Sequence, residues 1–188
     1  MRRILLGCGM AAALLMTTIT APVAEASKLP TLTPTGGYGS WTVIDAAPSP
    51  LDGSPNFTAQ INADNAVMAT RGQPKKPILA FFCDHDGFSL NIKWPANINI
   101  SRGQVSETLL WKVDDGRLTR SELGFDRTAL IQEGRPANVL AHLWAGGKLL
   151  VVRVPDNFGG QDATFQLDGL DLIMAHIDQT GCGPARSK

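Results

Sequence analysis

The sequence predicts a mainly β fold of the α+β class: a small antiparallel sheet or sandwich with one or two packed helices and one disulfide. Three observations predict it. Short apolar segments that alternate with polar residues recur along the chain, which is typical of half-buried strands. Two pairs of these segments are joined by short turns rich in Asp and Gly, which favours β-hairpins. Two cysteines far apart in the chain, Cys83 and Cys182, can close the domain with one bridge.

The N-terminal 26 residues have the three parts of a secretory signal peptide. Met1-Arg2-Arg3 is positively charged, residues 4–16 are mainly apolar, and Ala24-Glu25-Ala26 is an Ala-x-Ala cleavage site. The apolar part is shorter than the ~20 residues that cross a bilayer. The alternatives are a retained anchor and a lipoprotein signal, because Leu5-Leu6-Gly7-Cys8 resembles a lipidation box. We favour cleavage near Ala26 and therefore expect a periplasmic or secreted protein.

The charge balance excludes one class of partner. The chain of 188 residues has 17 basic and 17 acidic residues, and removal of residues 1–26 leaves 15 and 16, a net charge of about −1. A chain without a basic excess lacks the charge that nucleic-acid binding requires. No second apolar segment is long enough to span a membrane. We expect a flexible Pro- and Gly-rich segment over 27–40, a single β-rich globular domain over 41–184, and a tail over 185–188.

The strands of this domain are expected at regular intervals along the chain. Residues 46–56 contain three prolines and must form a loop, because proline cannot donate a ladder hydrogen bond. One hairpin turns at Asp84-His85-Asp86-Gly87. A second turns at Asp114-Asp115-Gly116, where Asp-Gly supplies the positive φ of a tight turn. The expected strands are 41–44, 57–61, 78–83, 88–94, 105–113, 117–123, 149–154 and 163–167.

Two further segments have the periodicity of amphipathic helices. The first runs from Pro136 to Ala145, with proline in its first turn and Gly146-Gly147 as its stop. The second, C-terminal helix begins at Asp168, its expected N-cap, and runs to about Gln179. The residues expected to face the core are Val139, Leu140, Leu143 and Trp144 in the first helix and Leu170, Ile173, Met174 and Ile177 in the second.

The cysteine count predicts a single disulfide. Loss of Cys8 with the signal peptide leaves Cys83 and Cys182, and two thiols in an oxidising compartment form one bridge. The bridge would enclose 98 intervening residues, for which the loop-entropy model gives on the order of 4–5 kcal/mol. Because no Cys-x-x-Cys pair is present, we expect the bridge to be structural. Two free buried thiols are the alternative.

No motif for nucleophilic, metalloprotease or phosphate-binding chemistry is present. The sharpest polar cluster is Asp84, His85 and Asp86, which could hold a metal or move a proton. The same residues also suit a tight turn, and we favour that interpretation. No catalytic residue, cofactor or metal ligand is therefore assigned. A dispersed carboxylate pair such as Asp114 with Asp156 stays open, because one sequence does not show spatial neighbours.

The four tryptophans are the other candidate contact residues, because exposed aromatic side chains mark carbohydrate- and protein-binding surfaces. Trp94, Trp111 and Trp144 lie on the apolar faces of their elements, so we expect them in the core. Trp41, at the start of the first strand, is the one expected as a surface contact.

Seven segments recur together in the order in which a known family has them: Trp41, Pro77–Cys83, Leu90–Trp94, Trp111–Gly116, Leu149–Val154, Ala163–Leu170 and Cys182. In these segments the chain resembles the VasI-type family of exported proteins associated with bacterial type VI secretion. The resemblance covers about Trp41–Cys182. It implies the β-rich fold, the bridge and an association with secretion. It transfers no catalytic residue, because the family has none established.

The sequence as a whole predicts a non-enzymatic accessory or interaction domain of the bacterial cell envelope. We expect it to bind a protein partner through an edge or face of its sheet, with a link to a secretion system. One alternative is an inhibitor or binder of a secreted hydrolase. A second is a metal-dependent enzyme centred on Asp84, His85 and Asp86, and a third is carbohydrate binding through an exposed tryptophan. The partner and the oligomeric state are not predicted.

Overall fold

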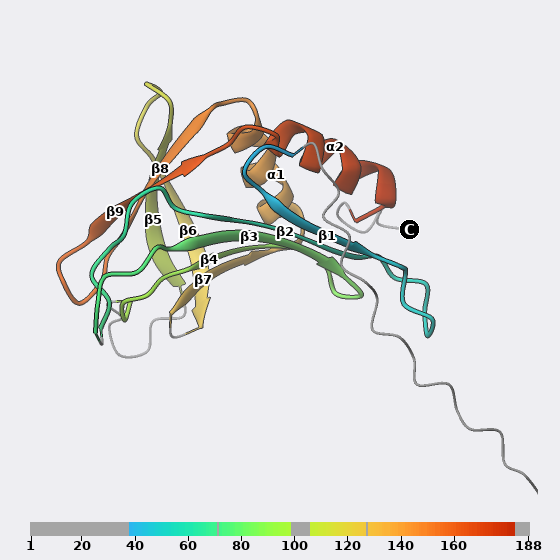
Figure 1. Ribbon diagram of the computed structural model, residues 1–188, viewed down its shortest axis with the longest axis horizontal. Coiled ribbons are helices and arrows are strands. Elements are labelled where there is room, and N and C mark those ends of the chain that lie inside the picture. The colour runs from blue at the N-terminus through green and yellow to red at the C-terminus, as the bar shows by residue number, and fades with distance from the viewer. Residues whose placement is uncertain (1–37, 71, 99–105, 127, 183–188) are drawn as a thin grey trace, which may run out of the picture.

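The computed structural model describes residues 38–70, 72–98, 106–126 and 128–182. The predicted signal peptide, the lead-in as far as residue 37 and the predicted tail lie outside the described residues. Within these ranges nine strands form one antiparallel sheet in the order β1-β2-β3-β4-β7-β6-β5-β8-β9, and two helices pack on it (Figure 1). The predicted α+β class is confirmed, in its single-sheet form. Neither described helix is long and apolar enough to cross a membrane.

Each predicted strand has a counterpart in the sheet, and β7 is the strand that the sequence does not reveal. It has five residues, of which only Leu130 is fully enclosed, so it shows no clear alternation. It lies between β4 and β6. The elements are β1 Thr42–Ala46, β2 Asn56–Asn62, β3 Ile78–Asp84, β4 Gly87–Lys93, β5 Ser106–Val113, β6 Thr119–Asp126, β7 Ala129–Glu133, α1 Gly134–Ala145, β8 Leu149–Val154, β9 Gln161–Gln166 and α2 Leu170–Thr180.

Both predicted hairpins are present, as β3–β4 and β5–β6. The β5–β6 turn differs from the prediction in one respect, because the positive φ belongs to Asp114 (50°) and not to Gly116. The Asp114 carboxylate accepts hydrogen bonds from the backbone N–H groups of Lys148 and Leu149, at 3.1 and 2.9 Å. These bonds to the start of β8 stabilise a conformation that is otherwise unfavourable for a residue with a side chain.

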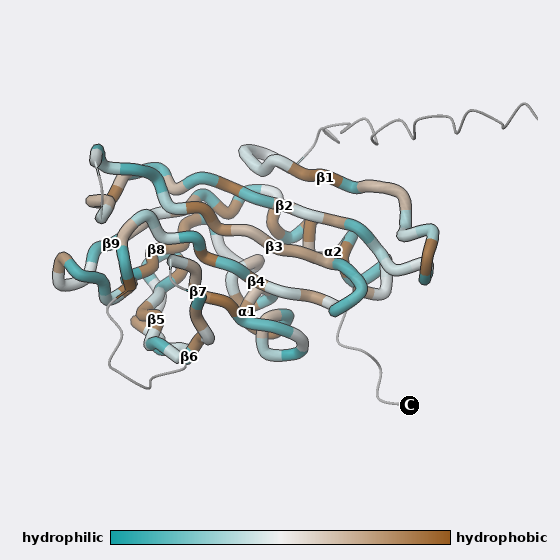
Figure 2. Tube along the Cα trace, turned by 90° about the horizontal axis from the view of Figure 1, so that it is seen from below, coloured by the Kyte–Doolittle hydropathy of each residue, from teal (hydrophilic) through white to brown (hydrophobic). Residues whose placement is uncertain are grey.

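The hydrophobic core lies between the curved sheet and the two helices. Figure 1 shows both helices on one side of the sheet, and in Figure 2, seen from below, β2 and β3 pass in front of α2. Alternate residues along β2 and β4 are enclosed, as the period of a strand requires. Trp94 and Trp144 are fully buried, and the Trp111 ring packs edge-on against Trp144 at 5.9 Å between centroids. The three predicted core tryptophans are confirmed.

The predicted disulfide fastens α2 to the sheet. Cys83 near the end of β3 and Cys182 just after α2 form the bridge, with their Cα atoms 5.7 Å apart. The four predicted core residues of α2 are all buried. The N-cap is Gly169 and not Asp168. Gly169 has a φ of 88°, and a Cβ there would lie 2.7 Å from the carbonyl carbon of Tyr38, so this close approach of two backbones requires glycine.

The helix α1 packs on the sheet with a face that only partly matches the prediction, because Leu140 and Trp144 are buried as expected. Val139 and Leu143, expected in the core, are 51% and 59% exposed. For these two residues the expectation is wrong because small side chains, which allow close approach of the helix to the sheet, form much of the packed stripe. The buried residues of α1 are Ala137, Leu140, Ala141 and Trp144.

The outer edge of the sheet at β9 is covered by the segment that follows β2. The backbone N–H of Asp64 donates to the Thr164 carbonyl at 2.7 Å, and Asn65 Oδ1 accepts from the Thr164 N–H at 2.9 Å. Gln161 Oε1 accepts from the Met68 N–H at 2.6 Å. This edge is therefore blocked against pairing with another chain.

Candidate functional site

The polar cluster predicted from the sequence lies on the exposed β3–β4 turn. One ligand atom from each of Asp84, His85 and Asp86 lies within 4.8 Å of the others, and all three residues are exposed. His85 Nε2 is 3.2 Å from Asp86 Oδ1. Asp84 Oδ1 accepts a hydrogen bond from the Asp86 N–H at 2.9 Å, which is how an Asp side chain stabilises a tight turn.

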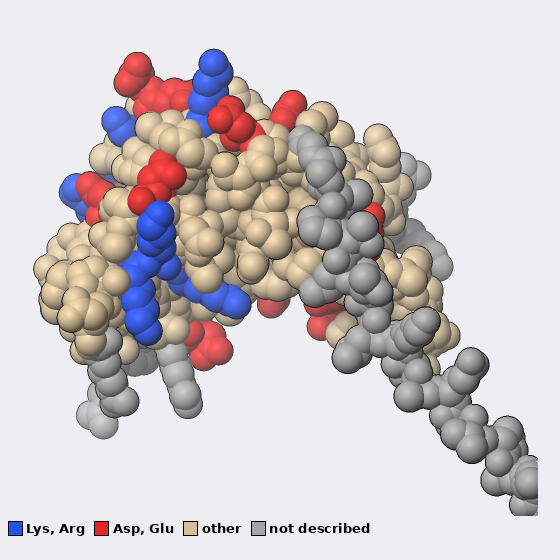
Figure 3. Space-filling model, viewed as in Figure 1, with Lys and Arg blue, Asp and Glu red and all other residues tan. Residues whose placement is uncertain are grey.

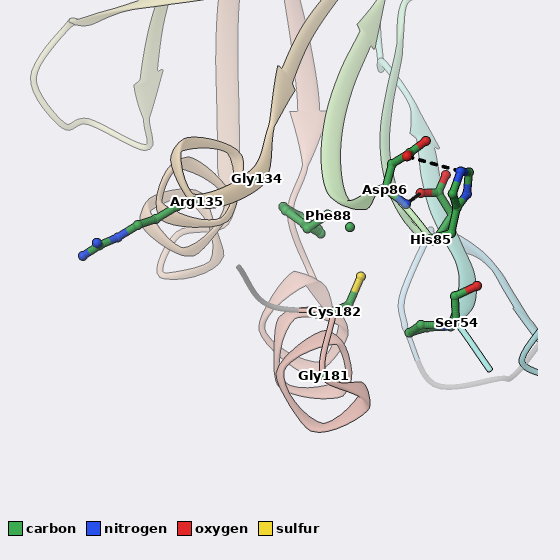
Figure 4. Close-up of a pocket in the computed structure, with 11 residues that line it drawn as sticks. Ser54, His85, Asp86, Phe88, Gly134, Arg135, Gly181 and Cys182 are labelled. Atoms are coloured by element: carbon green, nitrogen blue, oxygen red, sulfur yellow. Dashed lines mark hydrogen bonds and ion pairs between the residues drawn. The ribbon is translucent and has the colours of Figure 1, made fainter. Parts of the chain in front are cut away.

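This cluster borders a cavity of about 410 Å³ between the β3–β4 turn, the start of α1 and the end of α2 (Figure 4). Cys182 reaches the cavity, but its sulfur is in the disulfide. Arg135 points away from the cavity in Figure 4. Among the described residues that line it, none outside the cluster adds an imidazole, carboxylate or free thiol. A metal would therefore have three exposed ligands from consecutive residues, so the geometry favours a structural turn.

Trp41 is not a surface contact. Its side chain is 7% exposed, and its ring lies 5.5 Å from that of Phe81. The expectation is wrong because Trp41 continues the inward alternation of β1, in which Val43 is also buried. No tryptophan in the described part of the chain therefore offers an exposed ring for carbohydrate.

The two carboxylates left open as a dispersed pair, Asp114 and Asp156, are far apart. Asp114 contacts the start of β8, whereas Asp156 follows its end. The six-residue strand between them spans about 20 Å. They cannot act together as an acid and a base.

Asp156 is a buried structural anchor. It is 1% exposed and accepts hydrogen bonds from Trp94 Nε1 at 3.0 Å and Gln161 Nε2 at 2.6 Å. The backbone N–H groups of Phe158 and Gly160 also donate to it, at 2.9 and 3.2 Å. Burial acts to raise the pKa of this carboxyl, but the four hydrogen bonds outweigh burial and hold the pKa below its usual value. The carboxylate thus fixes the β8–β9 turn.

The other two histidines connect the helices to their neighbours. His142 Nε2 of α1 lies 3.4 Å from Asp178 Oδ1 of α2. His176 Nε2 of α2 lies 3.1 Å from Asp45 Oδ2 of β1. Neither belongs to a group of three metal ligands within the described ranges.

An apolar groove runs beside α1, and it is a site that the sequence does not predict. Its volume is about 440 Å³, and it lies between α1 and the β5–β6 hairpin. The half-exposed Val139 and Leu143 belong to its helix wall. The lining residues are Trp111, Thr119, Ser121, Arg135, Pro136, Val139, Leu140 and Leu143.

The groove lies where the helix layer stops covering the inner face of the sheet. Leu123 of β6 is fully buried, whereas Ser121 and Thr119, on the same face, are only half-buried. Trp111 Nε1 donates a hydrogen bond to Ser121 Oγ at 2.9 Å. This bond satisfies the indole N–H, and the Trp111 ring, which is only 8% exposed, lines the groove with its edge of apolar atoms alone.

The distribution of charge does not by itself mark a binding face. On the face shown in Figure 3, acidic and basic side chains are interspersed at the end formed by β5, β8 and β9. Arg153 and Asp162 pair there at 2.6 Å. By contrast, Arg135 is exposed at the groove and makes no ion pair with any residue that the structure describes.

The sequence contains a signal for this groove. The apolar residues of 136–145 cover a wider arc than one sheet-facing stripe needs. Such a helix has a second apolar flank beside the stripe that packs on the sheet. The prediction that both Val139 and Leu143 face the core does not take this second flank into account.

Comparisons of the chain with protein-family models, curated proteins and solved structures found no match.

Proposed function

We propose that this chain is an exported, non-enzymatic binding domain of the bacterial cell envelope that contacts a protein partner through the groove beside α1. The groove is the observation that carries the proposal. It exposes Val139 and Leu143 next to the Trp111 ring, with hydroxyl groups and one cation at its borders. A concave apolar surface with a few polar groups is typical of interaction sites.

Two further observations support export. The signal-like N-terminus would direct the chain out of the cytoplasm. The Cys83–Cys182 disulfide is of the kind that persists in an oxidising compartment. The resemblance to the VasI-type family adds an association with bacterial secretion to the proposal.

The non-enzymatic part of the proposal is supported by how the candidate polar groups are used. Asp84 stabilises its own turn, Asp156 anchors the β8–β9 turn, and Cys83 and Cys182 are bonded to each other. Each of these groups has a structural role that accounts for its position.

Site-specific photo-crosslinking in the producing cell tests the proposal. A photoreactive amino acid at Val139 should give a discrete adduct with one protein. The matched control is Leu172 on α2, which is 52% exposed against 51% for Val139, and it should give none. Equal adducts from both positions, or none from Val139, would contradict the proposal.

A second candidate function is favoured by one observation, the three metal-ligand atoms of Asp84, His85 and Asp86 within 4.8 Å of one another. Metal analysis of the purified chain separates it from our proposal. If the wild type holds a stoichiometric ion and His85→Ala does not, this turn has a metal-dependent role.

The identity of the partner distinguishes a further alternative. If the crosslinked partner is a protease or lysozyme that the chain inhibits 1:1, the domain is a hydrolase inhibitor.

A further inference from the structure

We infer that the partner contributes an extended segment that adds as a strand to the free edge of β6 and places a carboxylate against Arg135. This inference rests on the proposed function and specifies how the partner occupies the groove. Three features support it: an unpaired strand edge, a row of apolar side chains beside that edge, and a cation without an ion-pair partner.

The first feature is the length of β6 relative to its neighbour. It pairs with β5 over Thr119–Gly124 but with β7 only over Gly124–Asp126. The chain leaves β7 for α1 at Gly134, which has a φ of 62°. Over Thr119–Leu123, β6 therefore has no partner on this side among the described strands. Free N–H and C=O groups on an edge accept an added strand, and five residues offer about 17 Å.

The second feature is the apolar flank of α1 that faces the groove. Pro136, Val139, Leu140 and Leu143 line it at i, i+3, i+4 and i+7, a spacing that extends about 10 Å along a helix. The opposite flank meets α2, through His142 and Asp178.

A strand added to β6 would direct every second side chain toward the face on which α1 lies. Those side chains would contact Val139 and Leu143, while the backbone paired with β6. This arrangement combines main-chain hydrogen bonds for affinity with an apolar pocket for specificity, as in other cases of strand addition.

The third feature is Arg135 at the border of the groove. The other polar groups there already have partners, since Trp111 Nε1 donates to Ser121, and the Thr119 hydroxyl donates to the Arg117 carbonyl at 3.2 Å. A guanidinium without an ion-pair partner selects a carboxylate, because it can donate two parallel hydrogen bonds to it. The carboxylate can belong to an acidic side chain or to the C-terminus of the partner segment.

Peptide selection tests the chemistry of the occupant. Random ten-residue peptides are selected on the purified chain as the cell processes it. We expect enriched peptides that alternate apolar and polar residues and carry a carboxylate at one end. Amidated and free-acid synthetic forms distinguish the C-terminus from an acidic side chain.

Matched variants identify the residues responsible. Leu143→Lys should weaken binding of the selected peptides by about tenfold or more, as loss of one well-packed contact does. Leu172→Lys, the control on α2, should leave binding unchanged. Arg135→Glu should reverse the preference from acidic to basic peptides, and unchanged preference would contradict the role of Arg135.

Hydrogen exchange measured by NMR distinguishes an added strand from other occupants. A strand should slow exchange of every second amide in Thr119–Leu123, namely those that point away from β5. Selected peptides of helical period that leave these amides unprotected, or no enrichment at all, would overturn the inference. If the crosslinked native partner still requires Leu143, the proposed function survives that outcome. If the native partner binds Leu143→Lys as tightly as the wild type, the proposed function itself is wrong.

Discussion

Replacement of Asp156 by alanine should lower the free energy of unfolding by about 3–4 kcal/mol. Trp94 is 1% exposed, so its indole N–H would lose its acceptor with no access to water, at a cost of about 2 kcal/mol. The donors from Gln161, Phe158 and Gly160 are only part-buried and can regain water, so each costs about 0.5 kcal/mol.

Urea unfolding followed by tryptophan fluorescence measures this loss. The pKa of Asp156 is lower in the folded protein than its unfolded value of about 3.9. The Asp156 carboxylate therefore makes its full contribution to the free energy of unfolding above about pH 4. This contribution is lost as the pH falls through the pKa of the folded state. The difference in free energy of unfolding between the wild type and Asp156→Ala should therefore become smaller below pH 4. The control is the exposed Asp86→Ala. The reasoning would be refuted if Asp156→Ala lowered the free energy of unfolding by less than about 1 kcal/mol at pH 7. It would also be refuted if the difference from the wild type became larger in acid.

Three further outcomes follow from the same structure. Reduction of Cys83–Cys182 should destabilise the fold by about 4–5 kcal/mol in urea titrations, and an unchanged midpoint would show that the bridge is not structural. Gly169→Ala should lower the melting temperature more than Gly181→Ala. Both positions have a positive φ, but only Gly169 would place a Cβ 2.7 Å from another backbone. Equal decreases in melting temperature for the two variants would contradict that contact. His85→Ala should leave the melting temperature unchanged with or without added Zn²⁺, because the side chain is exposed. A zinc-dependent rise that this variant lacks would establish a metal site.

The parts of the fold that the sequence predicts are those governed by local patterns. The two hairpins follow from alternation and turn residues a few positions apart. The disulfide follows from the number of cysteines, and the packed stripe of α2 follows from Leu170, Ile173, Met174 and Ile177 alone. None of these inferences needs to know which distant strands are neighbours.

The parts that the sequence does not predict depend on neighbours from elsewhere in the chain. β7 is placed by its pairing with β4 and β6 and has too few buried residues to be recognised alone. Trp41 is enclosed because Phe81 lies beside it. The groove exists because α2 and the sheet leave one flank of α1 uncovered, so Val139 and Leu143 are exposed although their residue types suit a core.

The most direct test of the central claim is the affinity of the protein that crosslinks to Val139, measured by titration calorimetry. Three forms of the chain are compared: the wild type, Leu143→Lys in the groove and Leu172→Lys on α2. We predict that Leu143→Lys weakens binding by about tenfold or more and that Leu172→Lys binds as tightly as the wild type. Equal affinities for all three forms would contradict the claim that the free flank of α1 is the binding surface.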